Sequence, residues 1–319
     1  MDSALCNQTN SCMYISSVEW DMYPAAYSLF FIVGFPGNCL SLYVAWMLIK
    51  SGNNVAVYLT SLSISDLLYT ITLPVWIEMA LQRSVDENLC IVVNVIMHNS
   101  FYVGSGLLCC ISVDRYLAVV YPLYFHCIRE VRTAAAVSVA VWIVEIVIHI
   151  SLLHHTGALQ ASRYLCKQKI PMTQEDANVA LVRVVVGFLV PVLIMTFSFQ
   201  QIMQSLSQST SILAEERRKV GLLLLSLLLT YVASFLPYQA IMLLRATLEP
   251  ENCLWAKRLR NAYLVTVAIT TLNSTLDPII YCLINESAKK EIIQAMEKLK
   301  AIFKNRKKCS EGRGVKTIS

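Results

Sequence analysis

Seven long apolar segments, separated by short polar stretches, constrain the fold of this chain more than any other feature. The segments lie approximately at residues 24–49, 55–82, 88–119, 133–154, 177–206, 217–247 and 258–283. A helix needs about 20 predominantly apolar residues to cross a bilayer, and each segment reaches that length. Charged residues make up 15% of the chain, whereas about 25% is usual in a soluble domain. The sequence therefore predicts an all-α membrane protein, a seven-transmembrane helix bundle.

The distribution of basic residues predicts the orientation of the bundle. Residues 1–22 contain no Lys or Arg, and the other connections on that side mix acids with their basic residues. The connections on the opposite side carry an excess of positive charge: Lys50, Arg129, Arg132, Arg217, Arg218 and Lys219. Lys and Arg accumulate on the cytoplasmic side of membrane proteins. We therefore expect an extracellular tail at 1–22, a transmembrane domain at 23–283 and a cytoplasmic segment at 284–319.

Both ends of the chain carry local signals. Asn7-Gln8-Thr9 is an acceptor for N-linked glycosylation on an extracellular tail, although a three-residue motif also occurs by chance. Apolar residues recur at helical spacing between residues 286 and 303, with lysines on the opposite face. This pattern predicts a short amphipathic helix that lies on the membrane lipids of an anionic leaflet. Cys309, beyond it, is either an acylation site or an unmodified thiol.

Ionisable residues at membrane depth are the first candidates for function. Asp66, Glu145 and Asp277 lie inside the second, fourth and seventh segments. A carboxylate in lipid is costly unless it faces a cavity or a partner, and ionised carboxylates in one bundle repel one another. We therefore expect at least one of them to be protonated near neutral pH. The alternative is a polar core that binds Na⁺ near Asp66 and only stabilises packing.

The outer half of the predicted bundle contains four histidines: His98, His149, His154 and His155. Histidine changes its charge near physiological pH, so these side chains are candidate sensors of extracellular protons. His149 shares one helix face with Trp142 and Glu145, because residues three and four apart in a helix lie above one another. The alternative for each histidine is an ordinary solvated side chain.

Asp114-Arg115-Tyr116 ends the third segment, and an acid beside an arginine at a membrane boundary usually marks function. Each segment carries one such landmark, in the order Gly37-Asn38, Asp66, Asp114-Arg115-Tyr116, Trp142, Pro191, Pro237 and Asp277-Pro278-Ile279-Ile280-Tyr281. In this order the landmarks resemble those of rhodopsin-like (class A) G protein-coupled receptors over nearly the whole chain. The resemblance implies that G protein coupling involves Asp114, Arg115, Tyr116 and Tyr281, with Arg115 contacting the G protein after release from Asp114.

Within that superfamily, the chain resembles the branch of proton-sensing receptors and their lysolipid and oxidised-fatty-acid relatives, such as the T-cell death-associated and psychosine receptors. The residues that carry this resemblance are Tyr69, Leu73-Pro74-Val75-Trp76, Glu145, Arg183 and Asp277. The resemblance implies that Asp66, Glu145 and Asp277 bind protons on activation. The chain departs from the branch in lacking histidine in its N-terminal tail and its seventh segment.

A ligand pocket is expected in the outer half of the bundle, where Arg183 and Arg245 lie. Two arginines that face a cavity would bind a carboxylate or phosphate headgroup, whereas snorkelling to the interface is the alternative for each. An amine ligand is disfavoured, because Met97 stands where amine receptors have an acid. The candidate apolar walls, each of which is otherwise a core residue, are Trp76, Phe101, Tyr102, Met242 and Tyr263.

The cysteines do not suggest a metal site, because no CxxC pair stands at zinc spacing. Five cysteines are predicted on the oxidising outer side, where disulfides persist: Cys6, Cys12, Cys90, Cys166 and Cys253. The resemblance implies a bond between Cys90 and Cys166, and a second bond between Cys253 and either Cys6 or Cys12.

Several residues depart from the pattern of the superfamily. Phe235 stands where Trp is commoner, Tyr231 where Phe is commoner, and Phe199 where many receptors have Tyr. Arg217 stands where some receptors have an acid that locks Arg115. We therefore expect Asp114 and the buried carboxylates to hold the resting state.

The sequence thus predicts a plasma-membrane receptor that protons activate and that couples to heterotrimeric G proteins. The alternative agonist is an acidic lysolipid or an oxidised fatty acid. A proton-coupled transporter or channel is a more distant alternative, because the chain lacks the repeated halves typical of transporters. Its sequence contains no nucleophile elbow, His cluster or Gly-rich phosphate loop, so we expect no enzyme, no cofactor and no nucleic-acid partner.

Overall fold

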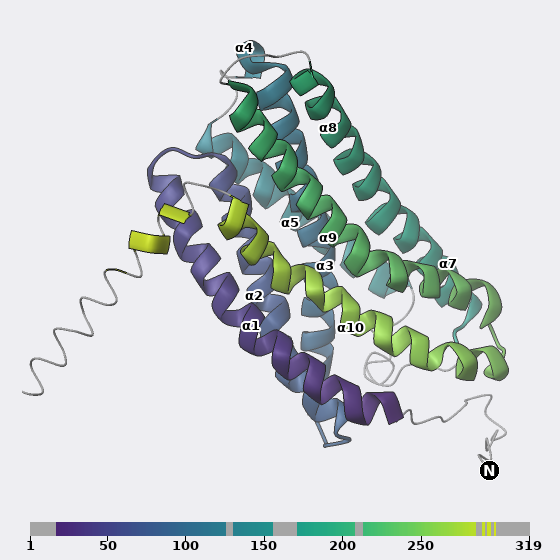
Figure 1. Cartoon of the computed structure of the whole chain (residues 1–319). Helices are drawn as coiled ribbons and strands as arrows, with labels where there is room; N and C mark the ends of the chain where they lie inside the picture. The colour runs from purple at the N-terminus through teal and green to yellow at the C-terminus, as the bar shows by residue number, and fades with distance from the viewer. Residues whose placement is uncertain are drawn as a thin grey trace, which may run out of the picture.

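The computed structural model is a bundle of long helices that run roughly along one another (Figure 1). It describes residues 17–125, 130–155, 171–207 and 213–284, and a few residues between 289 and 297. Within these ranges, seven helical spans are long and apolar enough to cross a membrane. The helices are α1 (Ser17–Lys50), α2 (Val55–Ala80), α3 (Glu87–Val120), α4 (Pro122–Phe125), α5 (Val131–His155), α7 (Gln174–Val184), α8 (Val190–Ser207), α9 (Leu213–Leu248) and α10 (Cys253–Ile284).

The fifth span is interrupted by a wider turn. A π-helical turn, η1 (Val185–Leu189), separates α7 from α8, so that the three together form one span from Gln174 to Ser205. π-Turns inside α-helices are rare and often lie at functional sites. The apolar run at residues 177–206 predicts the span but not this turn.

Two helices begin at least five residues earlier than predicted. Helix α1 begins at Ser17 and α10 at Cys253, whereas residues 24 and 258 were predicted. The added turns of α1 pack against α10, because Arg260 Nη2 lies 3.0 Å from Glu19 Oε1 and the Tyr23 hydroxyl donates to Leu264 O. These turns are polar enough to lie outside lipid, which is why an apolar-length criterion misses them.

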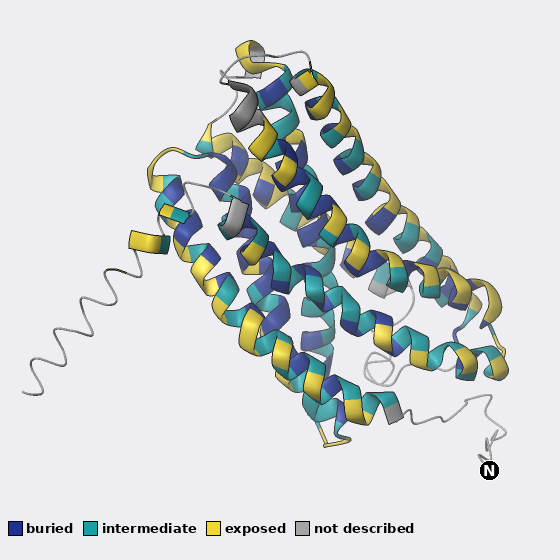
Figure 2. Cartoon of the chain, viewed as in Figure 1, coloured by how far each residue is buried: buried dark blue, intermediate teal, exposed yellow. Residues whose placement is uncertain are grey.

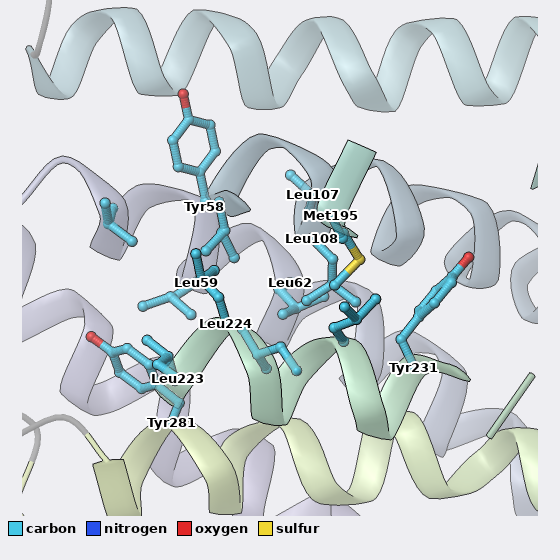
Figure 3. Packing of buried hydrophobic residues seen from close by; sticks show 14 of the residues in the cluster. Tyr58, Leu59, Leu62, Leu107, Leu108, Met195, Leu223, Leu224, Tyr231 and Tyr281 are labelled. Atoms are coloured by element: carbon cyan, nitrogen blue, oxygen red, sulfur yellow. The ribbon is translucent and has the colours of Figure 1, made fainter. Parts of the chain in front are cut away.

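The core of the bundle is apolar and lies where α2, α3, α8 and α9 meet (Figure 3). Leu107, Leu108, Met195 and Leu224 are almost fully buried there. Exposed residues line the outside of the helices (Figure 2). Helix α5 shows this best, because Ile143, Val144, Val147 and Ile150 are exposed. An apolar outer surface of this kind suits lipid.

The protected face of α5 confirms one prediction from spacing. His149 is buried and both Trp142 and Glu145 are partly buried, while residues 143, 144, 146–148 and 150 are exposed. The Trp142 indole donates to Ser61 Oγ of α2 over 2.9 Å. Glu145 and His149 are therefore turned toward the bundle rather than toward lipid.

Other predictions lie outside the described residues. They concern Cys6, Asn7, Cys12, Cys166 and Cys309, and most of the amphipathic helix predicted after residue 286. These predictions remain as stated.

Candidate functional site

Asp66 of α2 and Asp277 of α10 face the same small cavity in the middle of the bundle. Both side chains are buried, with relative exposures of 4% and 3%. The cavity has a volume of about 10 Å³, and Asn38 and Ser63 also line it. Asn273 donates to Asp277 Oδ2 over 2.9 Å. The structure therefore brings together the two carboxylates that lie 211 positions apart in the numbering.

The oxygen atoms of this site have too few hydrogen-bond donors. Asp66 Oδ2, Asp277 Oδ1, Asn38 Oδ1 and Asn273 Oδ1 are buried and have no hydrogen-bond partner among the described residues. Buried acceptors are normally paired, so these oxygens need a proton, water or a cation. Hard cations bind oxygen ligands of this kind. These four oxygen atoms could therefore bind either a proton or the Na⁺ ion that was considered from the sequence.

A second small cavity also adjoins Asp66. It has a volume of about 20 Å³ and is lined by Tyr69, Ser100, Asn273 and Ser274 among others. Asp66 lines both cavities. Each cavity has room for about one water molecule. The Asp66 side chain therefore separates two small cavities and contacts both.

Glu145 lies apart from the aspartate pair. It faces α3 across Gly106, where an added Cβ atom would lie 3.9 Å from Glu145 Oε1. Its charge acts on Tyr102, Cys109 and Tyr231. The predicted group of three carboxylates is thus divided in the structure: Asp66 and Asp277 form one site, and Glu145 lies near another.

Three basic side chains from three helices meet in the half of the bundle nearer the start of α1. The rings of His98 (α3) and His149 (α5) are stacked with their centroids 6.0 Å apart. Arg183 of α7 lies close enough for its charge to act on both rings and on the Tyr102 and Tyr238 hydroxyls. We call His98, His149 and Arg183 the basic cluster.

The basic cluster is poorly satisfied by hydrogen bonds. His98 Nδ1 lies 2.9 Å from Asn94 O. Both ring nitrogens of His149 and Arg183 Nε are buried without a hydrogen-bond partner among the described residues. His149 is only 4% exposed. The side chains of His154 and His155, at the end of α5, lie outside the described part of the chain.

The second predicted arginine has a different environment. The Arg245 guanidinium binds both carboxylate oxygens of Glu249, and it lies over the Tyr263 ring at 4.1 Å. Glu249 also accepts from Met172 N, at the start of the segment that leads into α7. Arg245 is therefore already paired, and Arg183 is the better anion-binding candidate. Sequence reasoning missed Glu249, although its i,i+4 spacing from Arg245 was the available signal.

The predicted apolar walls lie in three places. Phe101 packs edge-on against Tyr102 and Phe235, next to the basic cluster and the second cavity. Met242 packs with the cluster around Met172, and Trp76 lies in a separate outer cluster. The structure therefore does not gather the predicted pocket residues around one cavity.

Near the C-terminal end of α3, Asp114 lies between two partners. Asp114 Oδ2 lies 4.0 Å from Arg115 Nε, and Asn54 Nδ2 donates to Asp114 Oδ1 over 2.7 Å. The charge of Arg115 also acts on Tyr281 of α10, which is 3% exposed. The Tyr116 ring packs edge-on against Tyr121 and Phe197. Asn54 was missed from the sequence, because nothing local marks a contact over that separation.

Cys90 and Cys253 each take part in a disulfide bond. Their proposed partners lie outside the described residues, so the pairing stays a prediction. Cys39, Cys109, Cys110 and Cys282 are free thiols.

Comparisons with known proteins agree with this architecture. The family model "7 transmembrane receptor (rhodopsin family)" matches residues 37–281. The chain is 33% identical over 291 residues to G-protein coupled receptor 68 of Bos taurus, covering 90% of this chain and 80% of that one. It is 32% identical over 283 residues to human G-protein coupled receptor 65, covering 84% of each chain. It is also 28% identical over 307 residues to human lysophosphatidic acid receptor 4, covering 92% of this chain and 83% of that receptor.

Proposed function

The chain belongs to the rhodopsin family of seven-transmembrane receptors, and from that premise we propose that extracellular protons activate it and thereby its heterotrimeric G protein. It is a multi-pass membrane receptor, and its family is one of receptors rather than enzymes. We further propose that the N-terminal tail is extracellular, as the distribution of Lys and Arg indicates. The outer half of the bundle then faces the medium whose pH is sensed.

The observation that carries the proposal is the stacking of His98 and His149 beside Arg183. A proton on either ring adds positive charge next to a guanidinium, in a setting where few groups compensate it. Glu145 is the acid of this region, and Tyr102 and Tyr238 supply the other polar groups from α3 and α9. A conformation that separates or hydrates the basic groups therefore binds protons better than the resting one.

Differential proton affinity is sufficient to shift a receptor between two conformations. A ligand that binds one state better moves the equilibrium toward that state by the difference in binding free energy. Here the ligand is the proton, and acidification favours the state in which the basic cluster is opened. Movement of α3, α5 and α7 apart at this level is the expected structural consequence.

The aspartate pair is proposed as a second proton-binding site in the same transition. Two ionised carboxylates around one cavity repel each other, and a proton or Na⁺ removes that repulsion. Protonation would permit closer packing of α2 and α10 around Asp66 and Asp277. The two sites thus respond to acid in opposite senses, one by gaining repulsion and the other by losing it.

At the inner end, activation is proposed to release Arg115 from Asp114 and to move α9 outward. The pair lies at the membrane boundary where a G protein would bind. Tyr281, on which the charge of Arg115 acts, is placed to stabilise the released guanidinium.

An acidic lysolipid or fatty acid is the second candidate agonist. Arg183 Nε has no partner among the described residues, and the nearby tyrosine hydroxyls would add donors to a carboxylate or phosphate. One relative is named as a lysophosphatidic acid receptor. Such a ligand would bind at the same basic cluster.

The deciding experiment measures G protein activation in cells as extracellular pH is stepped from about 8 to about 6 without added lipid, a range that brackets the titration of histidine. Wild type is compared with the double variant His98→Gln, His149→Gln. Activation by acid in the wild type that is weakened in the variant supports the proposal. A flat wild-type response removes protons as the agonist, and acidic lipids would then be tested against Arg183→Ala.

A further inference from the structure

Tyr231 of α9 is fully buried and connects three elements of the bundle (Figure 3). Its hydroxyl oxygen lies 2.9 Å from the carbonyl oxygen of Gly187 in η1 and 3.0 Å from Ser105 Oγ of α3. Tyr231 stands at a position where the superfamily more often has Phe. A receptor of this family can therefore fold without a hydroxyl at this position. The two contacts of the Tyr231 hydroxyl indicate that it has a specific role in this chain.

The Gly187 carbonyl supplies the first reason for the hydroxyl. A π-helical turn disturbs the regular i→i−4 pattern, and a buried carbonyl without a donor is costly. Gly187 itself is required for the close approach, because a Cβ atom there would lie 2.5 Å from Tyr102 Cε1. The glycine thus lets α3 pack against η1, and Tyr231 donates to the buried backbone oxygen of Gly187.

Ser105 completes the network. Its hydroxyl oxygen lies 3.0 Å from Phe101 O as well as from Tyr231. Tyr231 and Ser105 have one hydroxyl proton each, whereas the three contacts would use three. When Tyr231 donates to Gly187, Ser105 is left to donate either to Phe101 or to the tyrosine oxygen. Tyr231 can donate to the Gly187 carbonyl while it contacts Ser105 only as long as α3, η1 and α9 stay together.

The ring of Tyr231 is packed independently of its hydroxyl. It stacks on Phe188 with a centroid distance of 5.9 Å and meets Phe235 edge-on at 4.8 Å. A phenylalanine at this position would keep both ring contacts. The change Tyr231→Phe therefore isolates the contribution of the hydroxyl.

We propose that the Tyr231 hydroxyl is a positioning group that holds α9 against α3 and η1 in the resting receptor. Any outward movement of α9 carries the hydroxyl away from Gly187 and leaves that carbonyl without its donor. The resting state is stabilised relative to the active state by this difference. The proposal rests on the receptor function of the family and is independent of whether the agonist is a proton or a lipid.

The test measures agonist-independent recruitment of a soluble G protein α-subunit to the full-length receptor at about pH 8, above the titration range of histidine. We expect Tyr231→Phe to raise recruitment about tenfold, the effect of one net hydrogen bond on a two-state equilibrium. Ser105→Ala should act in the same direction with a smaller effect. The double variant should be less than additive, because both changes disrupt one network.

Tyr23→Phe is the matched control. It also removes a buried tyrosine hydroxyl that donates to a backbone carbonyl, that of Leu264, but the bond joins α1 to α10. It should lower the melting temperature without raising recruitment. Equal or lower recruitment in both Tyr231→Phe and Ser105→Ala, relative to wild type, would overturn the proposal and leave the hydroxyl with a purely structural role.

Discussion

His98 and His149 belong to different helices, α3 and α5, and their rings stack with centroids 6.0 Å apart beside Arg183. Two stacked imidazole rings can pack against each other when both are neutral, whereas they repel each other when both are protonated. The interaction between the two rings therefore becomes unfavourable as the pH falls. This property makes the pair suitable as a sensor, and it leads to the first two predictions.

Replacing both histidines should weaken the response to acid. In the His98→Gln, His149→Gln variant, the outer site no longer gains charge, so activation must rely on the carboxylates. We expect the midpoint of G protein activation to move toward acid by about one pH unit, equivalent to roughly 1.4 kcal/mol. The measurement is a pH titration of G protein activation in cells. His126→Gln, at a histidine that the topology predicts on the cytoplasmic side, should leave the curve unchanged.

Removing the neighbouring charge should also weaken the response to acid. The repulsion between the Arg183 guanidinium and a protonated ring is what favours the opened conformation, so Arg183→Gln should reduce acid activation and shift its midpoint to a lower pH. Arg183→Lys retains the charge and should retain the wild-type midpoint. The same titration measures both variants. A midpoint in Arg183→Gln that equals that of Arg183→Lys would show that the charge of Arg183 does not act through the histidines.

The aspartate pair provides a third prediction. Asp277→Asn resembles the protonated carboxyl in size and lacks its charge, so it should relieve the repulsion with Asp66 permanently. We expect a higher signal at alkaline pH and a flatter pH dependence. Asp277→Glu keeps the charge and serves as the control, which should remain pH-dependent. A normal curve for Asp277→Asn would assign the pair to packing alone.

The sequence was sufficient to predict what depends on local length and spacing. The seven spans follow from apolar runs, and the protected face of α5 follows from the spacing of Trp142, Glu145 and His149. The apolar runs placed Asp66 and Asp277 in one bundle, where ionised carboxylates would repel each other, but they did not predict that the two side chains line one cavity. The separation of Glu145 from that pair was not foreseen, because it depends on how α5 is rotated against α3 at Gly106.

Contacts between distant residues could not be predicted in this way. The π-turn at Gly187 has no sequence signature of its own, and the Tyr231 hydroxyl bond depends on it. The bond between Asn54 and Asp114 joins a short connection to the end of another helix. Such contacts arise from the rotation and depth of each helix, which periodicity does not determine.

Asn54 leads to a fourth prediction. Its hydrogen bond to Asp114 Oδ1 holds the carboxylate from the side opposite Arg115. Asn54→Ala should loosen Asp114 and ease the release of Arg115, raising agonist-independent G protein recruitment about fivefold, which corresponds to about 1 kcal/mol, the net contribution of an ordinary hydrogen bond. Asn53→Ala is the control, because Asn53 caps the Val55 amide in the same turn without contacting Asp114. Equal effects of both variants would indicate a general loosening of the turn.

The last prediction concerns stability at the outer end of α9. Arg245 and Glu249 are both buried, at 6% and 0% exposure, and they form a bidentate pair. Removing one partner of a buried pair leaves an uncompensated charge and typically destabilises by about 3–5 kcal/mol. Glu249→Gln should therefore lower the melting temperature of the purified receptor strongly, although the glutamine oxygen can still accept the hydrogen bond from Met172 N.

The chain contains a matched control for that experiment. Arg83 and Glu78 form an ion pair with a similar N···O distance of 2.9 Å, but their side chains are 64% and 44% exposed. Exposed pairs contribute about 0–1 kcal/mol, because water and salt screen the charges. Glu78→Gln should therefore leave the melting temperature nearly unchanged. If the two variants melted at the same temperature, the Arg245–Glu249 pair would be solvated in the folded receptor, and the link it makes between α9 and the start of α7 would contribute little to the fold.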